Sequence, residues 1–147
     1  MKARVIEISN PDMIYNEELA GLFRDAYSNH PLAPFAFDED PSAFADLLLD
    51  PLVGVFVGSD HKDKLTTLLI VRLPTNVFFP YPVVEMLYNS GGKKVLKKII
   101  KKGRKFVEEA GFKTVIAHNS TKHSDQVWST LVPGEGKSLG AWYKFDW

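Results

Sequence analysis

The sequence contains no cysteine, and this absence removes several kinds of chemistry at once. Disulfides, thiolate metal centres and cysteine nucleophiles all require a thiol. The chain also lacks a run of the roughly 20 apolar residues that a membrane-spanning helix needs. Its first ten residues, MKARVIEISN, include no long apolar segment of the kind that secretion signals carry. We therefore expect a cytoplasmic protein that works without a membrane.

An excess of charge of either sign is absent too. The 18 Lys and Arg residues balance the 18 Asp and Glu residues, which gives a formal net charge of +0 at pH 7. Proteins that bind nucleic acid usually carry a clear positive excess, so nucleic acid is not the expected partner. His118 and His123 are not accompanied by acidic residues at metal-ligand spacing, so we expect no metal site.

Apolar residues, by contrast, are sufficient for a buried core. They make up 45% of 147 residues, a length typical of one domain. We expect residues 1–147 to form a single domain, as a monomer or homodimer. β-branched apolar runs predict strands at 3–8, 52–58, 65–73, 83–89 and 113–119, with a last strand in the tail 136–147. Helical spacing of apolar residues predicts helices at 14–27, 41–50, 91–112 and 124–131.

The order of these predicted elements indicates an α/β (α+β) fold. The strand at 83–89, the long helix and the strand at 113–119 require a crossover connection, which pairs the two strands in parallel. The two strands between 52 and 73 flank a short polar turn and read as an antiparallel hairpin. We expect a mixed, mostly antiparallel sheet with helices on both faces.

The segment NSGGKK at 89–94 joins a predicted strand to the longest predicted helix. The first turn of a helix has unpaired N–H groups and a positive dipole end, and glycine lets a ligand approach the backbone. Such a corner can hold a phosphate group. The N–H groups would come from Ser90, Gly91, Gly92, Lys93 and Lys94. The alternative is that the glycines only turn the chain, since neither standard glycine-rich phosphate motif is present.

The long helix combines an apolar face with a lysine-rich remainder. A basic stripe of this kind can bind nucleic acid, but a solvated outer face is the simpler interpretation. Only the lysines of the first turn are close enough to assist an anion at the corner. The apolar face is expected to comprise Val95, Leu96, Ile99, Ile100, Gly103, Phe106, Val107 and Ala110.

The order of the elements, with this corner after the fourth strand, resembles the GNAT superfamily of N-acetyltransferases. The family motif Gln/Arg-x-x-Gly-x-Gly/Ala is best matched by LYNSGGKKVL at 87–96. Gly92 fits the final glycine, Ser90 replaces the middle one, and Leu87 stands where Gln or Arg is usual. The phrase EEAGFKTVIAHN at 108–119 extends the resemblance, which spans nearly the whole chain and is shared by compact phage-encoded proteins.

The resemblance implies a GNAT-like sheet of six to seven strands and acetyl-CoA as cosubstrate. The coenzyme's pyrophosphate is expected on the glycine corner. Its pantetheine arm is expected along the backbone of Met86, Leu87 and Tyr88, and near Asn119. The implied reaction moves an acetyl group to an amine of a small molecule or a protein, by direct attack of the amine on the thioester.

Glu85 stands on the fourth strand, where the resemblance places a general base. Its apolar neighbours predict partial desolvation, which suits proton abstraction. The alternative is a structural glutamate paired with a lysine. The tyrosine that the family uses as general acid is missing, because Thr130 occupies its place. Tyr143 is our candidate acid, with Tyr88 or solvent as alternatives.

Three aromatic-rich segments, 28–40, 74–82 and 138–147, correspond to the family's acceptor site. The candidate substrate-binding residues are His30, Phe35, Phe78, Phe79 and Tyr81. Alternatively, these aromatic residues cover an edge of the sheet. Because the general acid and the phosphate motif are both irregular, a second hypothesis is a catalytically inactive GNAT-like module with a structural or protein-interaction role.

Overall fold

The computed structural model describes residues 3–28, 42–75, 77–118, 136–138 and 142–146. The elements in this part of the chain, in order, are β1 (Arg4–Glu7), the 3-10 helix η1 (Pro11–Tyr15), α1 (Glu17–Ser28), α2 (Ser42–Leu49), β2 (Val53–Ser59), β3 (Leu65–Arg72), β4 (Val83–Asn89), α3 (Lys93–Glu109), β5 (Thr114–His118), β6 (Gly136–Ser138) and β7 (Trp142–Asp146).

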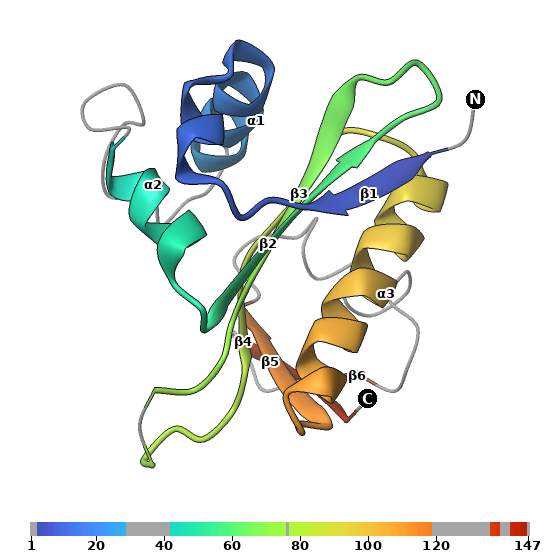
Figure 1. Ribbon diagram of the computed structural model, residues 1–147. Helices are drawn as coiled ribbons and strands as arrows, with labels where there is room; N and C mark the ends of the chain where they lie inside the picture. The colour runs from blue at the N-terminus through green and yellow to red at the C-terminus, as the bar shows by residue number, and fades with distance from the viewer. Residues whose placement is uncertain (1–2, 29–41, 76, 119–135, 139–141, 147) are drawn as a thin grey trace.

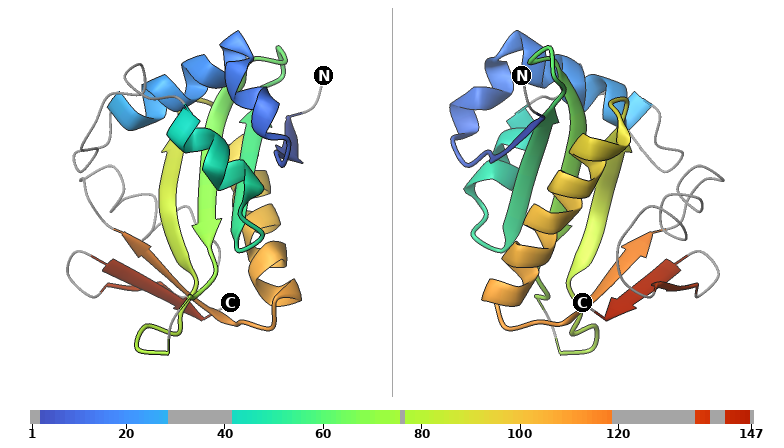
Figure 2. Two further views of the ribbon diagram at one scale, coloured as in Figure 1. Left: turned by 60° about the vertical axis from the view of Figure 1, so that its left-hand side comes forward. Right: turned by 90° about the vertical axis from the view of Figure 1, so that its right-hand side faces the viewer.

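The strands form one seven-stranded sheet in the order β1-β2-β3-β4-β5-β7-β6. Each neighbouring pair is antiparallel except β4 and β5, which are parallel across the α3 crossover. Helices α1 and α2 cover one face of the sheet, and α3 covers the other (Figure 1 and Figure 2). The predicted mixed, mostly antiparallel sheet with helices on both faces is therefore confirmed.

Two parts of the predicted element order differ from the structure. The tail contains two short strands, β6 and β7, where we expected one, and they pair antiparallel with each other from Gly136↔Phe145 to Ser138↔Tyr143. Before α1, residues 11–15 form a 3-10 helix that the turn signal did not predict. The predicted helix at 124–131 lies outside the described residues. No described helix is long and apolar enough to cross a membrane.

The core has two halves, one on each face of the sheet. Because successive strand residues point to opposite faces, Leu69 and Val71 of β3 pack with α3, whereas Leu68 and Ile70 pack with α1 and α2. Burial on both faces explains why β2 and β3 read as nearly continuous apolar runs. The two halves are tied together by the backbone of the sheet itself.

The start of α1 and the end of α3 follow rules that are visible in the sequence. The side chain of Asn16 caps α1 by accepting hydrogen bonds from the N–H groups of Glu18 and Leu19, each 3.1 Å long. After α3, Gly111 has a φ of 89°, and its N–H bonds to the carbonyl of Glu108. The N–H of Phe112 then bonds to the carbonyl of Val107, which completes a Schellman ending.

At the start of α3, the β-branched side chain of Val95 packs against the sheet between Gly58 and Gly91. A Cβ on Gly58 would lie 2.5 Å from Val95 Cγ2, and one on Gly91 would lie 2.8 Å from Val95 Cγ1. Real Cβ atoms do not approach other carbons this closely, so both positions exclude larger residues. Val95 therefore packs tightly against β2 and the β4–α3 corner, and this packing fixes the distance between the start of α3 and the sheet.

We predict opposite effects for alanine at two glycines. Gly58→Ala should lower the free energy of unfolding by about 1–3 kcal/mol. The new methyl group would overpack the core against Val95, whose β-branched side chain has a restricted χ1 angle. Gly21→Ala, in α1 with nothing within 4 Å of the new Cβ, should raise it by about 0.5–1 kcal/mol. Urea unfolding of both variants measures this. A Gly58→Ala protein with the same free energy of unfolding as the wild type would contradict the close packing of α3 on the sheet.

Candidate functional site

Strand β4 contains an irregularity at Glu85. Ile70 of β3 pairs with Met86 and the next residue, Val71, pairs with Val84, so Glu85 has no partner in β3. Residues two apart share a face in a regular strand, yet Val84 packs with α3 while Met86 packs with α1 and α2. The register shift is thus a β-bulge, a device that re-aims side chains and bends a strand.

The same place marks the end of the pairing between β4 and β5. Only Val83↔Ile116 and Val84↔Ala117 are paired, with a supporting 2.9 Å bond from the N–H of Ile116 to the carbonyl of Pro82. Beyond them β4 runs on to Asn89 while β5 ends at His118, and the two strands separate (Figure 2). From Glu85 onward, the described residues place no strand on this side of β4, and an unpaired strand edge can accept an extended ligand.

The corner after β4 uses two of its own N–H groups. The N–H of Ser90 donates to the carbonyl of Thr66 at 2.8 Å, and the Ser90 hydroxyl donates to the same oxygen at 3.2 Å. The N–H of Gly91 donates to Asn89 Oδ1 at 3.0 Å. Gly91 also has no room for a side chain, because its Cβ would lie 2.5 Å from Thr66 Oγ1. The N–H groups of Ser90 and Gly91 are therefore already used within the corner. Of the five N–H groups expected to bind an anion, those of Gly92, Lys93 and Lys94 remain.

The first turn of α3 supplies the remaining donors. Its first backbone bond runs from Leu96 N to the carbonyl of Gly92, the N-cap residue, and no side chain of the described residues caps the helix. The N–H groups of residues 92–95 thus lack intrahelical partners. Nothing lies within 4 Å of a Cβ built on Gly92, and Lys93 and Lys94 are exposed beside it. This open, uncapped and positively charged turn is suited to an anion.

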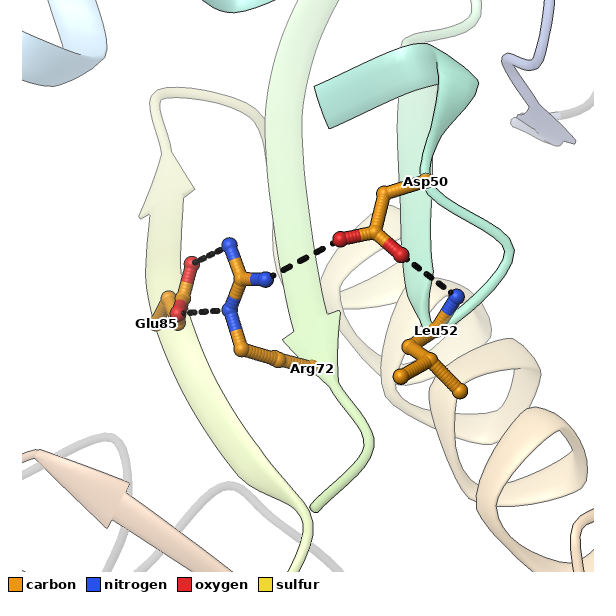
Figure 3. Close-up of polar contacts among 4 residues, drawn as sticks. All are labelled: Asp50, Leu52, Arg72 and Glu85. Carbon is orange, nitrogen blue, oxygen red and sulfur yellow. Dashed lines mark hydrogen bonds and ion pairs between the residues drawn. The ribbon is translucent and has the colours of Figure 1, made fainter. Parts of the chain in front are cut away.

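Glu85 belongs to an ion-paired group with Arg72 and Asp50 (Figure 3). Arg72 Nε lies 2.5 Å from Glu85 Oε1, Arg72 Nη2 lies 3.5 Å from Oε2, and Arg72 Nη1 lies 3.3 Å from Asp50 Oδ2. The side chain of Glu85 is 36% exposed, so it is partly shielded and keeps contact with solvent. Its ion-pair partner is Arg72, whereas the structural alternative expected a lysine.

The charges of this group shift the ionisation of their neighbours. The hydrogen bond from Arg72 to Glu85 raises the pKa of Arg72 above its usual value, against the opposing effect of burial. Burial raises the pKa of Tyr27 to about 12, with the negative charge of Glu85 adding to the rise and Arg72 opposing it. Tyr27 lies on α1 with its ring centroid 4.7 Å from that of Phe44. The sequence predicted Tyr27 only as the last residue of the helix at 14–27.

The other candidates are placed unevenly. Met86 is buried, and Leu87 and Tyr88 are partly buried. Asn119, His30 and Phe35 lie outside the described residues, as does the side chain of Tyr143, whose backbone pairs with Ala117 in β5. Within the described residues, no three histidine or acidic side chains are grouped as a metal site.

The aromatic loop between β3 and β4 projects from the end of the sheet at which β4 begins (Figure 1). Phe78 is 94% exposed, Phe79 and Tyr81 are less so, and the rings of Phe79 and Tyr81 meet edge to face with centroids 5.9 Å apart. These three residues share one loop, but the described residues do not show them lining a site with Glu85.

This mixed sheet, with its separating parallel strands and uncapped strand-to-helix corner, has the same fold as solved acetyltransferases that include a GNAT-family member. The aminoglycoside 6'-acetyltransferase type Ii structure matches with a TM-score of 0.69 and 13% identity, over 97% of this chain and 96% of that one. An N-acetyltransferase from Staphylococcus aureus Mu50 matches with a TM-score of 0.70 and 12% identity, over 99% of both chains.

A GNAT-family acetyltransferase from the same bacterium matches with a TM-score of 0.64 and 10% identity, over 98% of both chains. By sequence, neither a protein-family model nor a curated protein matches this chain. At such low identities the likeness establishes the fold, and the roles of individual residues rest on the geometry of the site.

We predict that Gly92→Asp stabilises the free protein. The new carboxylate would cap the unpaired N–H groups and face the positive end of the α3 dipole, and there is open space for it. The free energy of unfolding should rise by about 1 kcal/mol. Gly92→Asn, which caps without charge, should give a smaller rise. Thermal unfolding measures both; no rise in either variant would mean that these N–H groups already have partners.

Proposed function

We propose that this protein is an acetyl-CoA-dependent N-acyltransferase that moves an acetyl group to an amine. The observation that carries the proposal is that, among the described residues, the uncapped first turn of α3 lies next to an edge of β4 that has no neighbouring strand. The turn offers N–H groups for a pyrophosphate, and the edge offers a backbone ladder for an extended arm. A helix face of lysines alone would offer charge without either set of fixed donors.

The residues present fit this cosubstrate. The N–H groups of residues 92–95 would hold the pyrophosphate, and Lys93 and Lys94 would add positive charge at its rim. The backbone of Glu85–Tyr88 would hold the pantetheine arm and orient the thioester beside the bulge. Acetyl-CoA supplies an activated acetyl group, whose carbonyl the amine nitrogen attacks as the carbon–sulfur bond breaks.

Glu85 is proposed as the group that accepts the proton of the amine, directly or through one water. A carboxylate has about four lone-pair positions, and Arg72 occupies two of those of Glu85. The remaining positions can accept an N–H of a protonated amine. The ion pair with Arg72 therefore orients the carboxylate and leaves lone pairs available to accept the proton. The departing thiolate takes a proton from Tyr143 or from solvent.

The proposed acceptor is a cationic amine. Two carboxylates and one guanidinium leave the group of Asp50, Arg72 and Glu85 with one net negative charge on the α1–α2 face. Such a charge attracts cations to a partly exposed site. Among proteins of similar structure, one is a spermidine N-acetyltransferase from Vibrio cholerae, and one is an aminoglycoside acetyltransferase in complex with sisomicin. Phe78, Phe79 and Tyr81 would contact the body of such a molecule.

One observation favours the alternative of a non-catalytic binding module. Val77 and Phe78 are adjacent in the loop between β3 and β4 and are 84% and 94% exposed, and contiguous exposed apolar surface is a feature of partner-binding sites. If the module hypothesis is correct, coenzyme-dependent turnover is absent with every amine. A turnover assay therefore separates the two functions.

We predict that Glu85→Gln abolishes turnover and leaves coenzyme binding intact. Release of CoA from acetyl-CoA can be followed with a thiol reagent, since the chain has no cysteine of its own. With sisomicin or spermidine as acceptor, kcat should fall about 100-fold or more. CoA should still raise the melting temperature, because a ligand bound only to the folded state stabilises it.

Glu108→Gln is the matched control. Glu108 also pairs with an arginine, Arg104, at 2.8 Å, but it lies at the far end of α3 and should keep wild-type turnover. Gly92→Asp should lose the CoA-induced rise in melting temperature. Undiminished turnover in Glu85→Gln would remove Glu85 as the base, and a wild-type protein that CoA does not stabilise would contradict the whole proposal.

A further inference from the structure

Two threonines, Thr66 and Thr67, are the buried polar side chains of the described core, and both lie beneath the β4–α3 corner. Thr67 is 0% exposed, and its Oγ1 donates to Asn89 Oδ1 at 2.8 Å. The same Asn89 oxygen accepts the N–H of Gly91 at 3.0 Å. A chain of hydrogen bonds therefore runs from the middle of the sheet, through one amide oxygen, into the backbone of the corner.

The corner is also held from its other side. The carbonyl of Thr66 accepts both the N–H and the hydroxyl of Ser90. The two threonine hydroxyls lie 3.2 Å apart, so the two sets of bonds are connected. Satisfied buried networks of this kind rigidify the backbone that they contact. Within the part of the chain that the structure describes, the bonded N–H groups stop at Gly91, and those without a helical or capping partner begin at Gly92.

The hydroxyl of Thr67 is not needed for packing. Valine has nearly the same shape, suits a β-strand equally well, and avoids the cost of burying a polar group. The role of threonine at this position therefore lies in the hydrogen bond of its hydroxyl to Asn89. Asn89 in turn holds the turn that orients the N–H groups of residues 92–95.

We propose that Thr67 is a positioning residue for the pyrophosphate of the coenzyme. Acting through Asn89, it holds the corner in one conformation. The N–H groups of residues 92–95 are then already directed at the pyrophosphate position in the free protein. The network thus compensates for Ser90 and Leu87, which depart from the GNAT motif at its glycine and its Gln/Arg positions. A preorganised site loses less ordering entropy on binding. This inference rests on the proposed use of acetyl-CoA.

The test compares two ligands across three proteins: wild type, Thr67→Val and Thr67→Ser. CoA carries the pyrophosphate, and pantetheine is the same arm without it. For Thr67→Val, the Kd of CoA in titration calorimetry should rise about tenfold, the effect expected from the loss of one well-placed hydrogen bond. The Kd of pantetheine should not change. Thr67→Ser keeps the hydroxyl and should restore wild-type affinity for CoA, although it loses a methyl group.

The outcomes separate this inference from the proposed function. Wild-type affinity for CoA in Thr67→Val, with CoA binding to the wild type, overturns the positioning role and leaves the function standing. Equal weakening of CoA and pantetheine in Thr67→Val also overturns it, because that pattern reports general damage to the fold. If the wild type does not bind CoA, the proposed function and the positioning role fail together.

Discussion

The short pairing between β4 and β5 is the constraint on which the rest of the site depends. Two residue pairs hold the strands together, and the bulge at Glu85 then turns β4 away. Beyond those two pairs, the described residues place no strand beside this edge of β4. At the bulge, Glu85 has no partner in β3, and its carboxylate pairs with Arg72. The strand then ends at Asn89, close to the start of α3 at Lys93.

The second requirement is that the end of β4 be held still, since no pairing with β5 supports it. The structure meets this with contacts from the other side of β4. Val95 is wedged between Gly58 and Gly91, and Thr67 is bonded to Asn89. Rigidity from β2 and β3 thus compensates for the missing neighbour. The different roles of the two adjacent glycines follow from this: Gly91 serves packing, whereas Gly92 leaves space for a ligand.

The elements with strong local signals could be predicted from the sequence, and the contacts between distant residues could not. The stripe of Val95, Leu96, Ile99 and Ile100 predicted the buried face of α3. Glu85 was expected to be partly desolvated because its sequence neighbours are apolar, and no ion-pair partner was indicated other than a lysine. Its surroundings are set instead by a one-residue register shift and by Arg72, 13 positions away. Likewise, the N–H and the hydroxyl of Ser90 both donate to the carbonyl of Thr66, 24 positions earlier, and no local sequence pattern reveals this contact.

The central claim is that backbone N–H groups of the first turn of α3, rather than the lysine side chains along its outer face, hold the phosphates of a coenzyme. Amide chemical shifts of 15N-labelled protein titrated with CoA measure this directly. We expect the largest shifts at residues 92–95 and along Glu85–Tyr88, with little change at Ser90 and Gly91, whose N–H groups are already bonded. Shifts confined to the outer lysines, such as Lys97 and Lys101, or no shifts at all, would contradict the claim.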